Sequence, residues 1–188
     1  AFGADGRAYV LDRARRVQRF AADGTAVDQL VAPDLRVNPL AVTAGADGAV
    51  VATDGGVLAA NDVDGAPRWQ GPAIPAGREG HGVALALDPG APDGGAAHEL
   101  DGFGGRTYAY RMSDGARMSA AERTLTGAPD GSSIWADLDR DAAGTLYVLD
   151  RGARTVHALS GAADERVIPL AARARRLAVA PDGSFYTL

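Results

Sequence analysis

The sequence predicts an all-β protein built from tandem four-stranded units, and three observations predict this fold class. Glycine and proline supply 35 of the 188 residues, well above the usual share of roughly 12%, which indicates many turns. Short apolar and β-branched runs alternate with Asp-Gly and similar turn pairs, a pattern typical of β-hairpins. No segment keeps apolar residues at helical spacing for longer than a turn or two.

A glycine followed six positions later by an aspartate marks the repeated unit. It occurs in the segments 6–12, 48–54, 95–101 and 144–150, and a fifth segment begins at Gly183. The leading glycines lie 42, 47, 49 and 39 residues apart. Tandem four-stranded units of about 40 to 50 residues are typical of β-propeller blades. A sandwich or barrel with accidental periodicity is the structural alternative.

The turn pairs divide each unit into four strands, which we call a, b, c and d in chain order. In the first complete unit we expect strand a at 38–45, b at 49–53, c at 57–60 and d at 66–71. The later strands a are expected at 82–87, 133–136 and 176–180. The predicted organisation is a partial blade over 1–31, blades over 37–71, 80–125 and 132–170, and a partial blade over 175–188.

Several segments resemble known propeller repeats. Residues 4–24, with the strands Tyr-Val-Leu-Asp and Arg-Val-Gln-Arg-Phe, resemble an NHL repeat, and residues 143–159 are similar but less complete. Residues 56–69 resemble the PQQ-type repeat, and residues 106–117 resemble propeller repeats of bacterial surface and secreted proteins. The resemblance covers nearly the whole chain and implies a propeller that serves as a binding platform at the surface of a bacterium or outside it.

Closure of the ring is the open question of this organisation. About four and a half blades are predicted, whereas propellers of these kinds usually have roughly six or more. Both ends would leave unpaired sheet edges, which natural proteins avoid. We therefore expect part of a larger propeller with six or more blades. A closed ring of four or five blades, and closure by other domains or a second chain, are the alternatives.

The charge balance limits the classes of partner. The formal net charge of −5 argues against a nucleic-acid-coating protein. All 19 basic residues are arginine, and only two asparagines and three isoleucines occur, as is typical of a high-GC genome; selection for anion binding is the alternative explanation. No apolar stretch approaches the roughly 20 residues of a membrane helix, so we expect no membrane insertion.

Propeller ligands usually bind at one end of the channel, where the b–c and d–a loops meet. We expect these loops at 12–16, 54–56, 101–105 and 150–154, and at 31–38, 72–82, 126–133 and 171–176. They carry ten arginines against seven acidic residues, so this face is basic and favours an acidic glycan, a small anion or a partner protein. The candidate ligand-binding residues are Arg13, Arg15, Arg16, Arg151, Arg154, Arg175, Arg176, Phe103 and His81.

The same loops also have a purely structural interpretation. The aspartate that ends each strand b is expected to accept backbone N–H bonds from its own loop. Neighbouring arginines would then pair with acidic residues in solvent. Phe103, in a glycine-flanked loop, is the candidate for an exposed aromatic anchor.

Two enzymatic alternatives depend on metal ions. Six-bladed propeller lactonases hold a divalent cation with carboxylate and amide oxygens, and here Asp137 and Asp139 are the candidates for such ligands. Propeller lyases use histidines, but His81, His98 and His157 fall on different predicted strands and do not converge. The sequence therefore predicts a non-catalytic binding scaffold without a cofactor. A metal-dependent lactonase or hydrolase and a structural spacer module are the alternatives.

Overall fold

The computed structural model describes residues 6–12, 16–31, 41–44, 50–53, 57–62, 65–72, 82–91, 94–127, 130–161 and 164–188. Within these ranges the regular structure is β-strand, apart from short 3₁₀ turns such as Ser119–Ala121. None of the helical turns in the described ranges has the length and apolar character that crossing a bilayer requires.

The described strands form five antiparallel sheets, each made of strands that are consecutive in the chain. The first sheet contains β1 (Ala8–Asp12), β2 (Arg16–Phe20) and β3 (Ala26–Val31). The second contains β4 (Ala41–Ala44), β5 (Val50–Thr53), β6 (Val57–Asn61) and β7 (Pro67–Pro72). The third contains β8 (Gly82–Asp88), β9 (Ala96–Asp101), β10 (Arg106–Arg111) and β11 (Arg123–Thr124). The fourth contains β12 (Trp135–Arg140), β13 (Leu146–Asp150), β14 (Thr155–Ser160) and β15 (Asp164–Pro169), and the fifth contains β16 (Leu177–Val179) and β17 (Phe185–Thr187).

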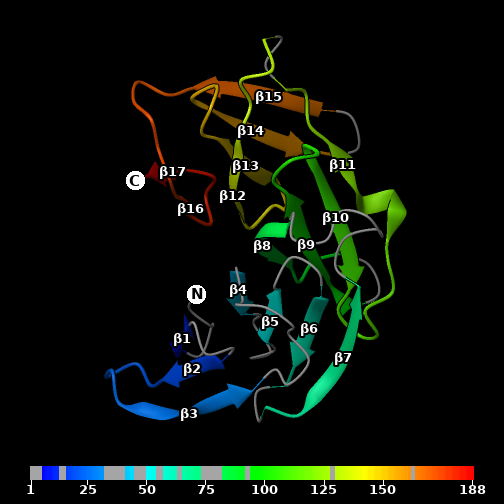
Figure 1. The fold of residues 1–188 in the computed structure, drawn as a ribbon, viewed down its shortest axis with the longest axis vertical. Helices are drawn as coiled ribbons and strands as arrows, with labels where there is room; N and C mark the ends of the chain where they lie inside the picture. Colours follow the sequence, from blue (N-terminus) through cyan, green and yellow to red (C-terminus); the bar gives the residue numbers. More distant parts are fainter. Residues whose placement is uncertain are drawn as a thin grey trace.

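The sheets follow one another around an arc, with β4, β8, β12 and β16 on its inner side and β3, β7 and β15 on its outer side (Figure 1). Successive sheets touch through these inner strands, since β4 contacts β8, β8 contacts β12 and β12 contacts β16. The predicted all-β fold of four-stranded antiparallel blades is therefore confirmed.

The repeated glycine has a conformational reason. Its φ is +77° at Gly6, +102° at Gly95, +89° at Gly144 and +83° at Gly183. A side chain with a β-carbon rarely adopts such values, whereas glycine adopts them freely. At these four described positions the glycine therefore closes the turn that leads into strand b.

The position three residues after the repeated glycine lies in the core between sheets. Tyr9, Val51, His98 and Tyr147 occupy it and are at most 5% exposed. Tyr186 occupies the same position in the fifth sheet but is 71% exposed. The difference arises because no further sheet follows β16 and β17 among the described residues.

The inner strand of the fourth sheet differs from its prediction. It was expected at 133–136, and β12 instead runs over Trp135–Arg140. Ile134 does not join the ladder, because its N–H donates to Asp150 Oδ1 at 2.8 Å and its carbonyl accepts the N–H of Arg151 at 2.9 Å. Ser133 and Ile134 therefore belong to the loop face rather than to the sheet.

Candidate functional site

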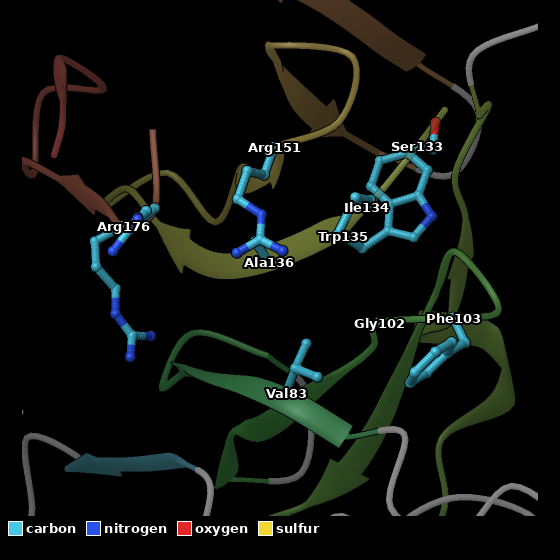
Figure 2. Close-up of a pocket in the computed structure, with 10 residues that line it drawn as sticks. Val83, Gly102, Phe103, Ser133, Ile134, Trp135, Ala136, Arg151 and Arg176 are labelled. Atoms are coloured by element: carbon cyan, nitrogen blue, oxygen red, sulfur yellow. The ribbon is translucent and has the colours of Figure 1, made fainter. Parts of the chain in front are cut away.

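A cavity of about 820 Å³ lies where loops and strand ends from the third, fourth and fifth sheets meet. Figure 2 shows Arg151 extending toward its centre, with Arg176 on one side and Phe103 on the other. Its lining residues are Val83, Gly102, Phe103, Ser133, Ile134, Trp135, Ala136, Arg151, Arg175 and Arg176.

The cavity brings together four of the nine predicted ligand-binding residues, namely Phe103, Arg151, Arg175 and Arg176. Phe103 is 78% exposed, so its predicted exposure is confirmed. Arg13, Arg15 and His81 lie outside the described residues.

Two predicted arginines lie elsewhere. Arg154 adopts a φ of +59° at the end of the β13–β14 turn, and its carbonyl accepts the N–H of Leu170 at 2.9 Å. Arg16 on β2 donates from Nη1 to Gln29 Oε1 at 3.2 Å. Neither side chain lines the cavity described above.

The loop that carries Phe103 is held by the aspartate of the repeat. Asp101 is fully buried, and its Oδ1 accepts the N–H of Phe103 at 2.9 Å and that of Gly104 at 2.6 Å. This is the loop-capping role that the sequence predicts for the aspartate. It fixes the backbone that presents the exposed ring.

Two glycines let the same loop lie directly on its neighbours. A β-carbon on Gly102 would lie 2.8 Å from Val83 Cγ1, and one on Gly105 would lie 2.7 Å from Trp135 Nε1. Both distances are too short for real atoms, so the loop rests on Val83 and Trp135 in a way that only glycine permits.

The loop that carries Arg151 is held in the same manner. Asp150 is fully buried, and its Oδ1 accepts N–H bonds from Gly152 at 2.9 Å and Ala153 at 3.0 Å as well as from Ile134. A β-carbon on Gly152 would lie only 1.7 Å from the Ser132 carbonyl oxygen. The backbone of the loop that carries Arg151 is therefore packed tightly against the segment that enters β12.

The electrostatic character of the cavity is cationic. Three arginines line it, and no acidic side chain does so among the described residues. Within the described ranges Arg151 and Arg175 form no ion pair, and Arg176 Nη1 lies 4.0 Å from Asp137 Oδ2 with 67% of its side chain exposed. An anion entering the cavity would therefore meet the positive charge of Arg151 and Arg175, which no described carboxylate pairs with.

A buried polar group supports the wall of the cavity from behind. The Trp135 ring packs edge-to-face on His157 with ring centroids 4.9 Å apart. His157 Nδ1 lies 2.6 Å from Glu165 Oε1, and its Nε2 lies 3.0 Å from Thr155 Oγ1. Burial raises the pKa of Glu165, but the hydrogen bonds from Thr126 and His157 outweigh it and hold that pKa below its usual value. His157 thus positions Trp135.

The metal-ligand candidates connect two sheets. Asp137 Oδ2 accepts the N–H of Leu177 at 2.9 Å, and Asp139 Oδ2 accepts the N–H of Val179 at 2.8 Å. The second oxygen of each carboxylate accepts the N–H of the next residue in β12. Burial raises the pKa of Asp137, although its backbone hydrogen bonds oppose that shift. In the described part of the chain no group of three histidine, aspartate or glutamate side chains is arranged to hold a metal.

Sequence reasoning did not identify Val83, Ile134 or Trp135 as part of a site. Trp135 and Ile134 were placed inside a predicted strand, and the two-residue shift of β12 brings Ile134 to the loop face. No sequence spacing marks these residues; the position of Ile134 follows from the close contact of Gly152 with the Ser132 carbonyl and the Ile134 nitrogen, which only the structure shows.

Comparison with known proteins identifies the fold. No protein-family model and no curated protein sequence matches the chain. A streptogramin B lyase structure matches with a TM-score of 0.75 and 16% identity over 100% of this chain and 60% of that chain. A catalytically inactive virginiamycin B lyase from Staphylococcus aureus with quinupristin matches with a TM-score of 0.72 and 14% identity over 96% of this chain and 58% of that chain. A protein of unknown function from Bacteroides caccae matches with a TM-score of 0.63 and 14% identity over 94% of this chain and 62% of that chain.

These similarities establish a β-propeller fold. The chain spans about 60% of the length of the streptogramin B lyase it matches. At 14 to 16% identity the likeness concerns the fold and not the activity.

Proposed function

We propose that this chain is a propeller scaffold that binds an anionic ligand in the cavity lined by Phe103, Arg151, Arg175 and Arg176. One observation carries the proposal: three cationic side chains and an exposed aromatic ring line one cavity, and no other described residue of its lining is acidic. Arginine forks favour planar anions through paired charge-assisted hydrogen bonds.

The rigidity of the loops supports the same function. Asp101 and Asp150 each fix a loop through several N–H bonds, so the site is ordered before a ligand arrives. A pre-ordered site loses less conformational entropy on binding, which favours affinity. The resemblance of residues 4–24 to an NHL repeat supports a binding platform as well.

An enzymatic role has less support from the residues of this cavity. Two matching structures are lyases, and acid–base chemistry of that kind needs a titratable group beside the reacting atoms. The described residues of the lining include arginines and apolar side chains but no histidine, aspartate or glutamate. On these residues, binding has more support than catalysis at this cavity.

Titration with the fluorescent apolar anion anilinonaphthalene sulfonate tests the proposal. We expect the double variant Arg151→Ala/Arg175→Ala to bind the probe at least ten-fold more weakly, since each charged hydrogen bond contributes about 1.5–3 kcal/mol. The control Arg106→Ala/Arg166→Ala removes the same charge from strands β10 and β15 and should keep the affinity. Binding should also weaken as salt rises. Equal affinities in the two variants would exclude the cavity as the site.

A further inference from the structure

The cavity has apolar walls as well as cationic side chains. Val83, Trp135 and Ala136 line it together with Ile134, which is 46% exposed, and Phe103, which is 78% exposed. Its volume of about 820 Å³ lies within the range of small-molecule sites, roughly 300–1,000 Å³. A ligand that fills this space has to cover apolar surface as well as meet the arginines.

The backbone of the two loops offers little to an anion. Phosphate sites in proteins commonly use clusters of free backbone N–H groups. Here Asp101 already accepts the N–H groups of Phe103 and Gly104, and Asp150 accepts those of Gly152 and Ala153. Apart from Ser133 and Trp135, the side-chain donors among the described lining residues are the arginines, whose planar forks fit the two oxygens of a carboxylate.

The lining is poorly suited to a glycan. Sugar hydroxyls are recognised by several uncharged or acidic polar side chains, because each hydroxyl both donates and accepts. Among the described residues of the lining, Ser133 supplies the one hydroxyl, and no asparagine, glutamine or acidic residue accompanies it. An aromatic ring alone can stack on a sugar ring but forms no hydrogen bonds that would recognise its hydroxyls.

We infer that the ligand of this cavity is a carboxylate carried by a planar apolar body, such as an aryl carboxylate. The carboxylate pairs with Arg151 and its neighbouring arginines, and the planar body lies between Phe103 and the wall formed by Ile134 and Trp135 (Figure 2). This inference rests on the proposed function and specifies the chemistry of its ligand.

Isothermal titration calorimetry with four probes tests the inference on the whole chain. The probes are naphthoate, its neutral counterpart naphthamide, inorganic phosphate and glucuronate. We expect naphthoate to bind at least ten-fold more tightly than each of the other three, since it alone combines the charge with the apolar body.

Two pairs of variants separate the parts of the site. Phe103→Ala should weaken naphthoate binding roughly three- to ten-fold, the contribution of one aromatic contact. Tyr186→Ala removes another exposed ring, on β17 outside the cavity, and should leave binding unchanged. Arg151→Ala should weaken naphthoate at least ten-fold and naphthamide little, whereas Arg166→Ala should affect neither probe.

The outcomes distinguish this inference from the function on which it rests. Phosphate or glucuronate binding as tightly as naphthoate, and weakened by Arg151→Ala, would overturn the aryl carboxylate and leave the anion site intact. Equal binding of naphthoate and naphthamide would overturn the role of the carboxylate. If neither these anions nor the sulfonate probe binds in an arginine-dependent way, both the inference and the proposed function are wrong.

Discussion

Replacing Gly152 by alanine should separate the Arg151 loop from the segment that enters β12. The added β-carbon would lie 1.7 Å from the Ser132 carbonyl oxygen and 2.9 Å from the Ile134 nitrogen. Both neighbours are backbone atoms, so no side-chain rotation can relieve the contact. The loop itself has to move, and the backbone contacts that hold Arg151 in the cavity are lost.

The loss in free energy of unfolding follows from the hydrogen bonds that this movement breaks. The N–H of Arg151 donates to the Ile134 carbonyl at 2.9 Å, and the N–H of Ile134 donates to Asp150 at 2.8 Å. Losing one neutral and one charged hydrogen bond costs about 1 and about 2 kcal/mol, and the crowding itself adds about 1–3 kcal/mol. We expect the free energy of unfolding to fall by about 4–6 kcal/mol in total.

Urea denaturation followed by circular dichroism measures this loss. Gly24→Ala is the matched control, because Gly24 has a φ of +82° and nothing within 4 Å of an added β-carbon. Its free energy of unfolding should fall by only about 1–2 kcal/mol, which is what alanine costs in the left-handed region of backbone angles. If Gly152→Ala loses no more than the control, the close packing of the two loops is refuted, and with it the rigid presentation of Arg151.

Three further predictions concern stability. Burial lowers the pKa of His98 to about 4, so stability should fall by about 1.4 kcal/mol per pH unit as pH drops below about 6.5, the unfolded value. This contribution should level off near pH 4 and be missing from His98→Phe, as urea denaturation of the two proteins at several pH values would reveal. Asp139→Ala removes the acceptor for Val179 on β16 and should lower the free energy of unfolding by about 2 kcal/mol. In thermal unfolding, the control Asp164→Ala, at the exposed start of β15, should lower stability far less. Equal losses in the two variants would contradict a role of Asp139 in joining β12 to β16. Glu165→Gln keeps the side-chain shape but weakens the partner of His157, so it should cost about 1 kcal/mol and shift the fluorescence of Trp135. An unchanged emission spectrum would show that His157 does not position the indole.

The blade pattern could be predicted because it follows from local backbone chemistry. The repeated glycine is needed at a positive φ, as Gly95 and Gly144 show. The aspartate six residues later caps the next loop, as Asp101 and Asp150 show. Both requirements act over a few residues, so the glycine and the aspartate recur at a fixed spacing in the sequence.

The parts that could not be predicted depend on contacts between distant segments. Trp135 becomes a cavity wall because the loop containing Gly105 rests on it, a contact across 30 residues that no spacing rule expresses. Asp137 and Asp139 looked like metal ligands, but their oxygens accept N–H groups from β16. Charge and residue type alone do not distinguish a cation site from a carboxylate that joins two strands.

The basic face was only partly resolved by sequence reasoning for a similar reason. The loop positions placed Phe103, Arg151, Arg175 and Arg176 on one face, and the structure brings these four to the lining of one cavity. Arg154 lies in the same loop as Arg151, yet its left-handed backbone at a φ of +59° places it outside the lining. Which side chains of one loop enter a cavity depends on backbone angles that the residue types do not fix.

Locating a bound anion tests the central claim most directly. A crystal structure of the protein soaked with bromonaphthoate would reveal the ligand by the anomalous signal of its bromine. We predict that the carboxylate lies within hydrogen-bonding distance of Arg151 and that the ring system lies against Phe103. Occupation of another surface, with this cavity holding only solvent at a saturating concentration, would contradict it.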